Sequence, residues 1–236
     1  MSTKTAIVTG ASSGIGRATV NRLIAEGYNV VAVARREARL QEMKEKWGDR
    51  IHVMSVDVTV VSDVEAMVKQ TIDQFGQIDV LVNNAGVGMI AALEDGKLDD
   101  WLTMIDVNVK GVLICLHACL PELIKSHGHI INLASVAAHD VFPNAVVYCA
   151  SKHAVNAITV GFRKEFREKV KITNISPGPV DTEFADHTDD EKLKEEFKKS
   201  FKGVVIKAED IAGAILHILN LPEYLVVNEY IIRPNK

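Results

Sequence analysis

Short apolar runs alternate along this chain with longer amphipathic stretches. Each run spans roughly four to seven residues and is rich in Val and Ile, which is typical of buried strands. Parallel strands need a crossover helix between them, so this alternation, without a linker or a repeat, predicts a single α/β domain over residues 1–236. The first six predicted strands lie in residues 5–9, 29–34, 51–56, 79–82, 129–135 and 171–176.

The amphipathic stretches predict the helices between these strands. Two of them are long, roughly Leu98–Ser126 and Val146–Lys169, and both carry more apolar surface than one face of a sheet needs. A shorter helix is predicted to open with the capping box Ser62-Asp-Val-Glu65 and to run through Phe75.

A glycine-rich turn follows the first predicted strand and precedes an amphipathic helix. Gly10, Gly14 and Gly16 lie in the sequence Gly10-Ala-Ser-Ser-Gly14-Ile-Gly16. Glycines let the backbone approach a pyrophosphate closely, and the N-terminus of the following helix offers free N–H groups. The pattern alone is also compatible with a plain strand-to-helix turn.

A tyrosine and a lysine lie four residues apart on the second long helix, as Tyr148 and Lys152. This spacing places both side chains on one helical face. A nearby ammonium group is expected to lower the pKa of the tyrosine hydroxyl toward neutrality, where it can transfer protons. Ser135, where an apolar run leaves a strand, could hydrogen-bond the oxygen of a substrate.

The end of the second strand carries positive charge. Arg35 and Arg36 follow the strand directly, and the first carboxylate after it is Glu37. Guanidinium groups bind phosphate well, and an arginine at this position accommodates the 2′-phosphate of NADP. The pair therefore predicts NADP(H), although one of the two arginines could simply be solvated at the start of the next helix.

Several motifs occur in one characteristic order: Gly10-x3-Gly14-x-Gly16, Asn83-Asn84-Ala-Gly86, Asn108, Ser135, Tyr148-x3-Lys152 and Pro177-Gly178. In order and spacing the chain resembles the short-chain dehydrogenase/reductase family over nearly its whole length. The resemblance implies a Rossmann-type, doubly wound, parallel seven-stranded sheet with helices on both faces. It also implies interconversion of alcohols and carbonyl compounds with NAD(H) or NADP(H), and a homodimer or homotetramer.

The resemblance also implies a catalytic tetrad. Tyr148 would act as the general acid/base and Ser135 would orient the substrate oxygen. Lys152 would lower the pKa of the tyrosine and hold the ribose of the cofactor. Asn108 would anchor a water of the proton relay, while a second reading makes it a polar residue that kinks its helix; both can hold together.

Cofactor contacts follow from the same motifs. An aspartate at the end of the third strand would contact the adenine, and the segment after the sixth strand would cover the nicotinamide. The residues implied are Gly10, Ser12, Ser13, Gly14, Ile15, Gly16, Arg35, Arg36, Asp57, Val58, Asn84, Tyr148, Lys152, Pro177, Gly178, Val180 and Thr182.

The substrate is constrained less tightly. The ending 226–236, with Arg35-Arg36 and Leu221-Pro-Glu-Tyr224, resembles the NADP-dependent branch that acts on serine and other small 3-hydroxy acids. The predicted pocket wall, residues 136–142 with Gly88 and Met89, holds no arginine to bind a carboxylate, which leaves small aldehydes and ketones open. The alternatives are a dehydratase or epimerase on this scaffold, or a cofactor-sensing binding protein.

A charged stretch after Thr182 is expected to lie near the substrate. Residues 183–202 include Leu193, Phe197 and Phe201, four apart, which gives a helix one apolar stripe. The stretch is predicted to be either a lid over the substrate or a packed surface helix.

Composition narrows the class of protein. With 236 residues, 47% of them hydrophobic, and a net charge of −4, the chain can bury a substantial core and offers no basic stripe for nucleic acid. We expect no membrane segment and a cytoplasmic location. The eight histidines show no metal-ligand spacing, so no metal is expected. Cys115, Cys119 and Cys149 are expected to be reduced structural thiols.

Overall fold

A seven-stranded sheet in which every pair of neighbours is parallel forms the centre of the molecule. The computed structural model describes residues 3–184, 188, 191, 193–195 and 205–235. The strand order is β3-β2-β1-β4-β5-β6-β9, so the predicted doubly wound sheet is confirmed. The strands are β1 (Thr5–Thr9), β2 (Asn29–Ala34), β3 (Ile51–Ser55), β4 (Val80–Asn83), β5 (His129–Leu133), β6 (Lys171–Pro177) and β9 (Glu229–Ile232).

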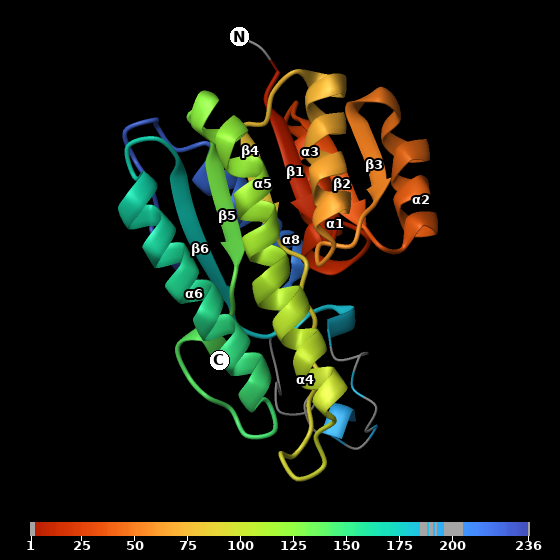
Figure 1. Ribbon diagram of the computed structural model, residues 1–236, viewed down its shortest axis with the longest axis vertical. Helices are drawn as coiled ribbons and strands as arrows, with labels where there is room; N and C mark the ends of the chain where they lie inside the picture. The colour runs from red at the N-terminus through yellow and green to blue at the C-terminus, as the bar shows by residue number, and fades with distance from the viewer. Residues whose placement is uncertain (1–2, 185–187, 189–190, 192, 196–204, 236) are drawn as a thin grey trace.

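Helices cover both faces of this sheet (Figure 1). Ala6 and Val8 of β1 pack with residues of the helices on one face, whereas Ile7 packs with those on the other, because successive side chains of a strand point to opposite sides. The first face carries α1 (Gly14–Ala25), α2 (Glu37–Trp47) and α8 (Ala208–Leu219); the second carries α3 (Val61–Phe75), α5 (Gly111–Lys125) and α6 (Val146–Phe166).

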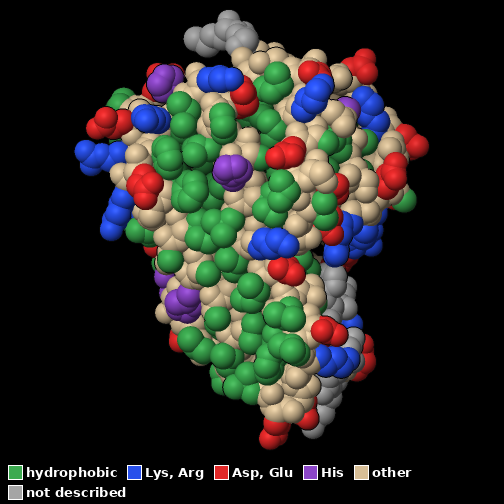
Figure 2. All heavy atoms as spheres, in the orientation of Figure 1, with side chains coloured by type: hydrophobic (Ala, Val, Ile, Leu, Met, Phe, Trp, Pro, Cys, Tyr) green, Lys and Arg blue, Asp and Glu red, His purple; other side chains and the backbone are tan. Residues whose placement is uncertain are grey.

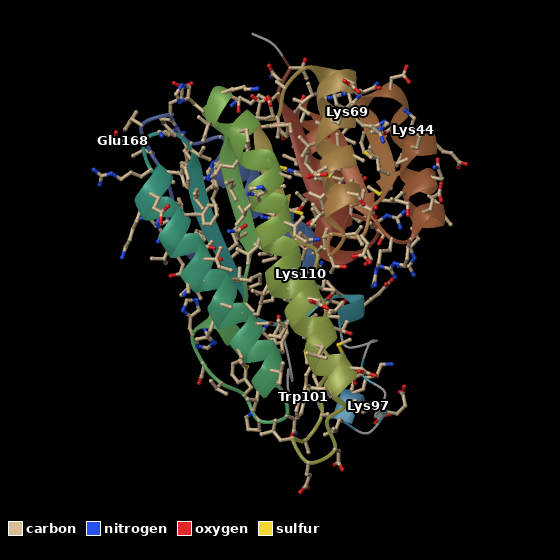
Figure 3. All side chains as sticks on the ribbon, in the orientation of Figure 1. Lys44, Lys69, Lys97, Trp101, Lys110 and Glu168 are labelled. Atoms are coloured by element: carbon tan, nitrogen blue, oxygen red, sulfur yellow. The ribbon has the colours of Figure 1, made fainter. Side chains whose placement is uncertain are left out.

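The predicted long helix 98–126 is one helical rod with an irregular middle. It consists of α4 (Leu98–Ile105), a π-helical turn (Asp106–Lys110) and α5. Lys110 marks this junction in Figure 3. On one side of this junction, α5 packs on the sheet. On the other side, α4 extends beyond the ends of the strands (Figure 1).

The outer side of this rod is apolar. Figure 2 shows hydrophobic side chains gathered over α4, α5 and α6. The exposed ones on the rod are Leu98, Leu102, Ile105 and Leu113. By length and composition alone the stretch Leu98–Lys125 could cross a membrane. Its other side is a core face, however, with Cys115, Leu116 and Cys119 buried against the sheet.

Two local features differ from the sequence predictions. Helix α3 begins at Val61 with Val60 as its N-cap and no side-chain cap, so the capping box was wrong. Asp63 of that box instead accepts a hydrogen bond from the backbone N–H of Asp57 at 3.1 Å. The sequence also gave no sign of the short parallel pair β7 (Val180–Asp181) and β8 (Ile206–Lys207).

The topology determines where a ligand can bind. Strand β1 lies between β2 and β4, so the chain winds outward from it in both directions. The loops that leave these strands at their carboxyl ends diverge to opposite faces and open a crevice between them. The predicted site residues therefore converge on one edge of the sheet.

Candidate active site

A cavity of about 280 Å³ lies at this carboxyl edge. The residues that line it come from the loops after β1, β2, β3, β4 and β6, and from β5 and α6. Among the predicted site residues, the cavity brings together Gly10, Ser12, Ser13, Gly14, Ile15, Arg35, Arg36, Asp57, Val58, Asn84, Tyr148, Lys152, Pro177 and Thr182. The other predicted site residues are not part of its lining: Gly16, Asn108, Ser135, Gly178 and Val180.

The glycine turn has a shape that only glycine allows. Gly10 and Gly14 have φ of +64° and +49°, in the left-handed region that other residues avoid. A Cβ on Gly14 would lie 3.0 Å from Thr182 Cγ2, and one on Gly16 would collide with the carbonyl oxygen of Gly10. The turn thus brings helix α1 close to its strand and leaves a cradle that a side chain would fill.

Asn84 holds this turn in place. Its Nδ2 donates to the carbonyl oxygens of Thr9 and Gly10, at 2.8 and 3.2 Å. The neighbouring Asn83 is buried and donates to Asn132 Oδ1 at 2.9 Å. The amide of Asn84 therefore supports the cradle, and the residue also lines the cavity.

The N-terminus of α1 is open toward the cavity. Ser13 is its N-cap residue, yet the Ser13 side chain makes no capping bond to the helix. Its Oγ accepts instead from Arg36 Nη2 at 2.6 Å, while Ser12 Oγ accepts from Arg36 Nε at 3.2 Å. The first N–H groups of the helix, with the positive end of its dipole, are thus not capped by Ser13 and can bind a phosphate.

Arg35 and Arg36 take different places at this edge. Arg36 contacts the glycine turn, whereas Arg35 lies near Asp57. Partial burial acts to raise the pKa of Asp57, but hydrogen bonds from Thr59 and the charges of Arg35 and Lys110 lower it overall. Asp57 Oδ1 accepts from the N–H and the hydroxyl of Thr59, at 2.9 and 2.7 Å, which fixes the loop after β3.

A third arginine, which the sequence analysis missed, joins this group. Arg39 Nη1 donates to both carboxylate oxygens of Glu183, at 2.7 and 2.8 Å. Arg36 Nη1 donates to Glu183 Oε2 at 2.8 Å. The Glu183 carboxylate thus lies between two guanidinium groups, in a position where they could also hold a bound anion. The three-residue spacing of Arg36 and Arg39 on a helix was a signal that could have identified the second group.

Tyr148 lies at the opposite part of the cavity, on the first turn of α6. Burial raises the pKa of its hydroxyl to about 12, although a hydrogen bond with Ser135 acts to lower it. The sequence predicted the opposite direction. The lysine that was expected to lower the pKa lies with its Nζ 5.8 Å from the centroid of the tyrosine ring, so in this structure the effect of burial dominates.

Lys152 is buried without a carboxylate partner among the described residues. It is 6% exposed, and its Nζ donates to the carbonyl oxygen of Leu133 at 2.8 Å. Burial lowers the pKa of Lys152 to about 8. Gly86 lies beside it, since a Cβ there would be 3.6 Å from this Nζ. The ammonium group is therefore held at the cavity by one backbone carbonyl and close packing.

Asn108 occupies the π-helical turn between α4 and α5. Its Oδ1 accepts from the N–H of Val87 and its Nδ2 donates to the carbonyl oxygen of Val87, both at 2.8 Å. Nδ2 also donates to Ser151 Oγ at 3.0 Å, next to Lys152 on α6. The helix is irregular here, as the second reading of Asn108 expected. Single π turns of this kind occur often at functional sites.

Phe184 packs on the tyrosine. The two ring centroids are 5.0 Å apart in an edge-on arrangement. The phenyl ring also lies over Gly88, where any Cβ would collide with it. Both Phe184 and Glu183 line the cavity, so the residues after Thr182 contribute to both ends of the site.

The segment after β6 forms one wall. Gly178 donates its N–H to the carbonyl oxygen of Ile232 at 2.7 Å, which anchors the segment to β9. Val180 pairs with Ile206 in the β7–β8 ladder. These contacts place Pro177 and Thr182 at the cavity while Gly178 and Val180 support them.

The predicted wall of the substrate pocket, residues 136–142, does not face the cavity. Within it, His139 Nε2 lies 3.1 Å from Ser176 Oγ and 3.0 Å from Glu229 Oε1. The histidine therefore links the wall to β6 and β9, and the residues of this wall are not among those that line the cavity.

The predicted lid, 183–202, can be followed only in part. The described residues within it are Glu183, Phe184, 188, 191 and 193–195. Phe197 and Phe201 of the predicted apolar stripe lie outside the described residues. The choice between a lid and a packed surface helix thus remains a prediction.

The cysteines and histidines form no metal centre among the residues that the structure describes. The three cysteines are free and buried, and burial raises the pKa of the Cys115 thiol to about 12. Both findings agree with reduced structural thiols in the core.

The fold and the site define a class of protein. The family model for short chain dehydrogenases matches residues 4–193, so the chain belongs to that family. A relative from Staphylococcus saprophyticus described as an uncharacterized oxidoreductase is 46% identical, over 98% of this chain and 96% of its own length. The protein is therefore an oxidoreductase of the short-chain dehydrogenase/reductase family.

Solved structures of similar proteins contain nicotinamide cofactors. A closed form of serine dehydrogenase complexed with NADP+ has a TM-score of 0.91 and 32% identity, over 97% of this chain and 94% of that one. An alcohol dehydrogenase from Thermococcus sibiricus with 5-hydroxy-NADP has a TM-score of 0.86 and 30% identity, over 99% and 100%. A family member from Burkholderia phymatum in complex with NAD has a TM-score of 0.88 and 25% identity, over 98% and 89%.

Proposed function

We propose that this protein is an NADP(H)-dependent oxidoreductase that interconverts a small alcohol and its aldehyde or ketone. The observation that carries the proposal is one cavity with two ends: Tyr148, hydrogen-bonded with Ser135, at one end, and the glycine turn with Arg36 at the other. A dinucleotide phosphate fits this arrangement, because the cradle, the open helix N-terminus and the guanidinium groups all favour bound anions.

Tyr148 carries the proton in this proposal. With its pKa raised to about 12, the hydroxyl is protonated at neutral pH and serves as the acid for carbonyl reduction. Ser135, hydrogen-bonded with the same hydroxyl, orients the carbonyl oxygen of the substrate toward it. When it is bound, NADP(H) supplies or accepts the hydride at the carbon of the same group.

Lys152 and Asn108 complete the proton path. The Lys152 ammonium, held by Leu133, stabilises the phenolate that remains after proton transfer and holds the ribose. Asn108 is bonded to Val87 and Ser151, and so fixes the backbone turn beside Lys152. We assign the water of the relay to the π-helical turn at Asn108, because single turns of this kind occur often at functional sites.

The choice of NADP(H) over NAD(H) rests on charge. The carboxylate of Glu183 between Arg36 and Arg39 supports an anion site at the place where the 2′-phosphate extends from the adenosine. Two of the similar structures contain NADP or a derivative of it and one contains NAD, so a direct comparison of the cofactors is the measurement needed.

The substrate end favours small, neutral molecules. Among the residues that line the cavity, Lys152 is the cation near Tyr148, while Arg35 and Arg36 belong to the opposite end. A substrate carboxylate would therefore have no arginine to bind within this lining. Small aldehydes and ketones are the substrates that this end of the cavity fits best.

A screen of NADPH oxidation tests the proposal. Small aldehydes, neutral ketones and 3-oxo acids are supplied in turn, with NADPH and with NADH, and the Tyr148→Phe variant serves as the control. We expect turnover of neutral carbonyl compounds with NADPH that the variant lacks. Tight cofactor binding without turnover on any carbonyl compound would favour the binding-protein alternative instead.

The apolar rod surface supports a homodimer or homotetramer. Leu98, Leu102, Ile105 and Leu113 form an exposed apolar strip that a second copy could cover. Light scattering of the purified protein measures the assembly, and a Leu102→Glu change should shift it toward monomer. A cytoplasmic location is likewise a proposal, which cell fractionation would test.

A further inference from the structure

A carboxylate from a distant part of the chain lies on the arginines proposed to bind phosphate. Glu183 is 144 residues from Arg39 and 147 from Arg36 in the sequence, so the fold alone brings them together. Both of its oxygens accept hydrogen bonds from guanidinium N–H groups. A carboxylate and a phosphate present similar acceptors to an arginine, so each can replace the other.

The guanidinium group of Arg36 is already oriented from its other side. Its Nε and Nη2 donate to the hydroxyls of Ser12 and Ser13, at 3.2 and 2.6 Å, and Nη1 donates to Glu183. The serines belong to the glycine turn, in which the amide of Asn84 bonds the carbonyl oxygens of Thr9 and Gly10. Arg36 can therefore stay in place while the anion beyond it changes.

The contact with Glu183 is exposed enough to exchange. The side chains of Arg36 and Glu183 are 47% and 43% exposed, and that of Arg39 is 38% exposed. Water screens ion pairs of this kind, so each contributes little to stability. Hydrogen bonds from Arg36, and then from Arg39, lower the pKa of Glu183, which keeps the carboxylate charged at neutral pH.

We propose that Glu183 is an internal competitor for the 2′-phosphate of NADP(H), and that Arg39 is a third phosphate ligand beside Arg35 and Arg36. The inference rests on the proposed use of NADP(H). The carboxylate must leave Arg36 and Arg39 before a phosphate binds there. NAD(H) has no 2′-phosphate and binds with Glu183 in place. The competition therefore weakens the binding of NADP(H) alone, and it reduces the preference for NADP(H) over NAD(H).

Calorimetry with cofactor fragments tests this without turnover. The probes are 2′,5′-ADP, which carries the 2′-phosphate, and 5′-AMP, which is the same molecule without it. We expect Glu183→Gln to bind 2′,5′-ADP about threefold to tenfold more tightly than the wild type, the range set by one or two exposed ion pairs. The affinity for 5′-AMP should stay within twofold.

Glu42→Gln is the matched control. Glu42 lies on α2, the helix that carries Arg39, and pairs with Arg17 at 3.2 Å, with the two side chains 59% and 44% exposed. The control removes the same charge from the same region without touching Arg36 or Arg39. Unchanged affinity of Glu183→Gln for 2′,5′-ADP would overturn the proposal. So would equal tightening for 5′-AMP, or a Glu42→Gln variant that behaves in the same way.

Arg39 provides a second, independent test. In the wild type, Arg39→Gln removes a phosphate ligand but also loosens the competitor, and the two effects partly cancel. In the Glu183→Gln background only the loss remains, so the same change should cost more affinity for 2′,5′-ADP there. Equal costs in both backgrounds would show that Glu183 does not compete with the phosphate for Arg39.

The outcomes separate this inference from the proposed function. Tighter 2′,5′-ADP binding by Glu183→Gln, in a protein without activity on any carbonyl compound, would support the competitor and refute the proposed reaction. If neither the wild type nor Glu183→Gln binds 2′,5′-ADP better than 5′-AMP, both the competitor and the use of NADP(H) are refuted.

Discussion

At the Tyr148 end of the cavity the polar groups are buried and two of them are bonded to backbone, whereas at the Arg36 end they are bonded to one another in contact with water. Lys152 and Asn108 are 6% and 1% exposed; Lys152 donates to the backbone of Leu133, and Asn108 bonds the backbone of Val87 and the hydroxyl of Ser151. Arg36 and Glu183 are each more than 40% exposed, and the partners of Arg36 are side chains.

This difference suggests that the side chains at the Tyr148 end are fixed in position, whereas those at the Arg36 end can rearrange. Groups bonded to buried backbone cannot move without disturbing the core, which suits chemistry that needs one geometry. Exposed ion pairs rearrange at little cost, which suits the selection between two similar ligands. We therefore expect changes at the Tyr148 end to affect rate strongly, and changes at the Arg36 end to affect affinity and selectivity by smaller factors.

The largest effect is expected from Tyr148→Phe. The change removes the hydroxyl that donates the proton and leaves the ring that packs on Phe184. General acid–base catalysis contributes roughly 10²–10⁴-fold, so kcat/KM should fall by that factor with the fold retained. Steady-state kinetics and circular dichroism measure the two properties.

Tyr224→Phe is its control. Tyr224 is 85% exposed and is not among the residues that line the cavity, so its loss of a hydroxyl should change neither rate nor fold. Near-normal activity of Tyr148→Phe would refute the assigned acid and, with it, the contrast between the two ends.

The sequence predicted the seven-stranded parallel sheet. Strand β2 begins at Asn29 and ends at Ala34, as predicted. A short run of Val and Ala between a glycine and two arginines is typical of a buried strand. The capping box was wrong because α3 begins one residue before Ser62, which places Ser62 inside the helix; Asp63 accepts from the backbone N–H of Asp57, six residues earlier in the loop that leads into α3.

The motifs also predicted which side chains would lie close together, but they did not predict how burial would change the pKa values of those side chains. Tyr148 and Lys152 lie at the same cavity, as their spacing implied. Burial then raises the pKa of the tyrosine, which no local pattern could reveal, since burial depends on the packing of β5 and α6. The contact of Glu183 with Arg39 joins residues 144 apart and follows only from the complete fold.

At the adjustable end, Arg36→Gln should have the largest effect. The neutral side chain cannot make charged hydrogen bonds to a phosphate, which contribute about 1.5–3 kcal/mol each. The preference for NADPH over NADH in kcat/KM should therefore fall by about tenfold to one hundredfold. Measuring both cofactors in the wild type and the variant decides the matter.

Arg35→Gln is the matched comparison for Arg36→Gln. Arg35 lies near Asp57 and not on the glycine turn, so its replacement should change the preference by a smaller factor. Parity of NADH and NADPH in the wild type would contradict the proposed cofactor. A larger effect at Arg35 than at Arg36 would contradict the geometry of the anion site.

The pH dependence reports on the buried lysine. With its pKa lowered to about 8, Lys152 is charged below pH 8 and loses its charge as the pH rises above it. Tyr148, with a pKa of about 12, remains a proton donor throughout this range. Carbonyl reduction should therefore be nearly constant below pH 7 and decline above pH 8, by up to about tenfold per pH unit.

The profile of kcat/KM against pH is the measurement, because it reports the groups of the free enzyme. The Lys152→Ala variant should be slower and should lack the decline near pH 8. A wild-type profile that stays level to pH 10 would show that the charge of Lys152 does not support the proton transfer.

The smallest effect is expected from Phe184, which connects the two ends through its neighbour Glu183. Its ring packs edge-on against Tyr148, and aromatic pairs of this kind contribute about 0.5–1.5 kcal/mol. Phe184→Ala should raise KM for small carbonyl substrates about threefold to tenfold, with kcat within twofold, and should admit bulkier ketones.

Gly88→Ala should act in the same direction, because a Cβ at Gly88 collides with the same ring. Phe166→Ala is the control: it removes a different aromatic pair, with Phe162 at 5.8 Å, and should lower Tm without changing KM. If Phe184→Ala lowered Tm as much as Phe166→Ala and left KM unchanged, the ring would be part of the structural core, and the end of the cavity at Tyr148 would be rigid throughout.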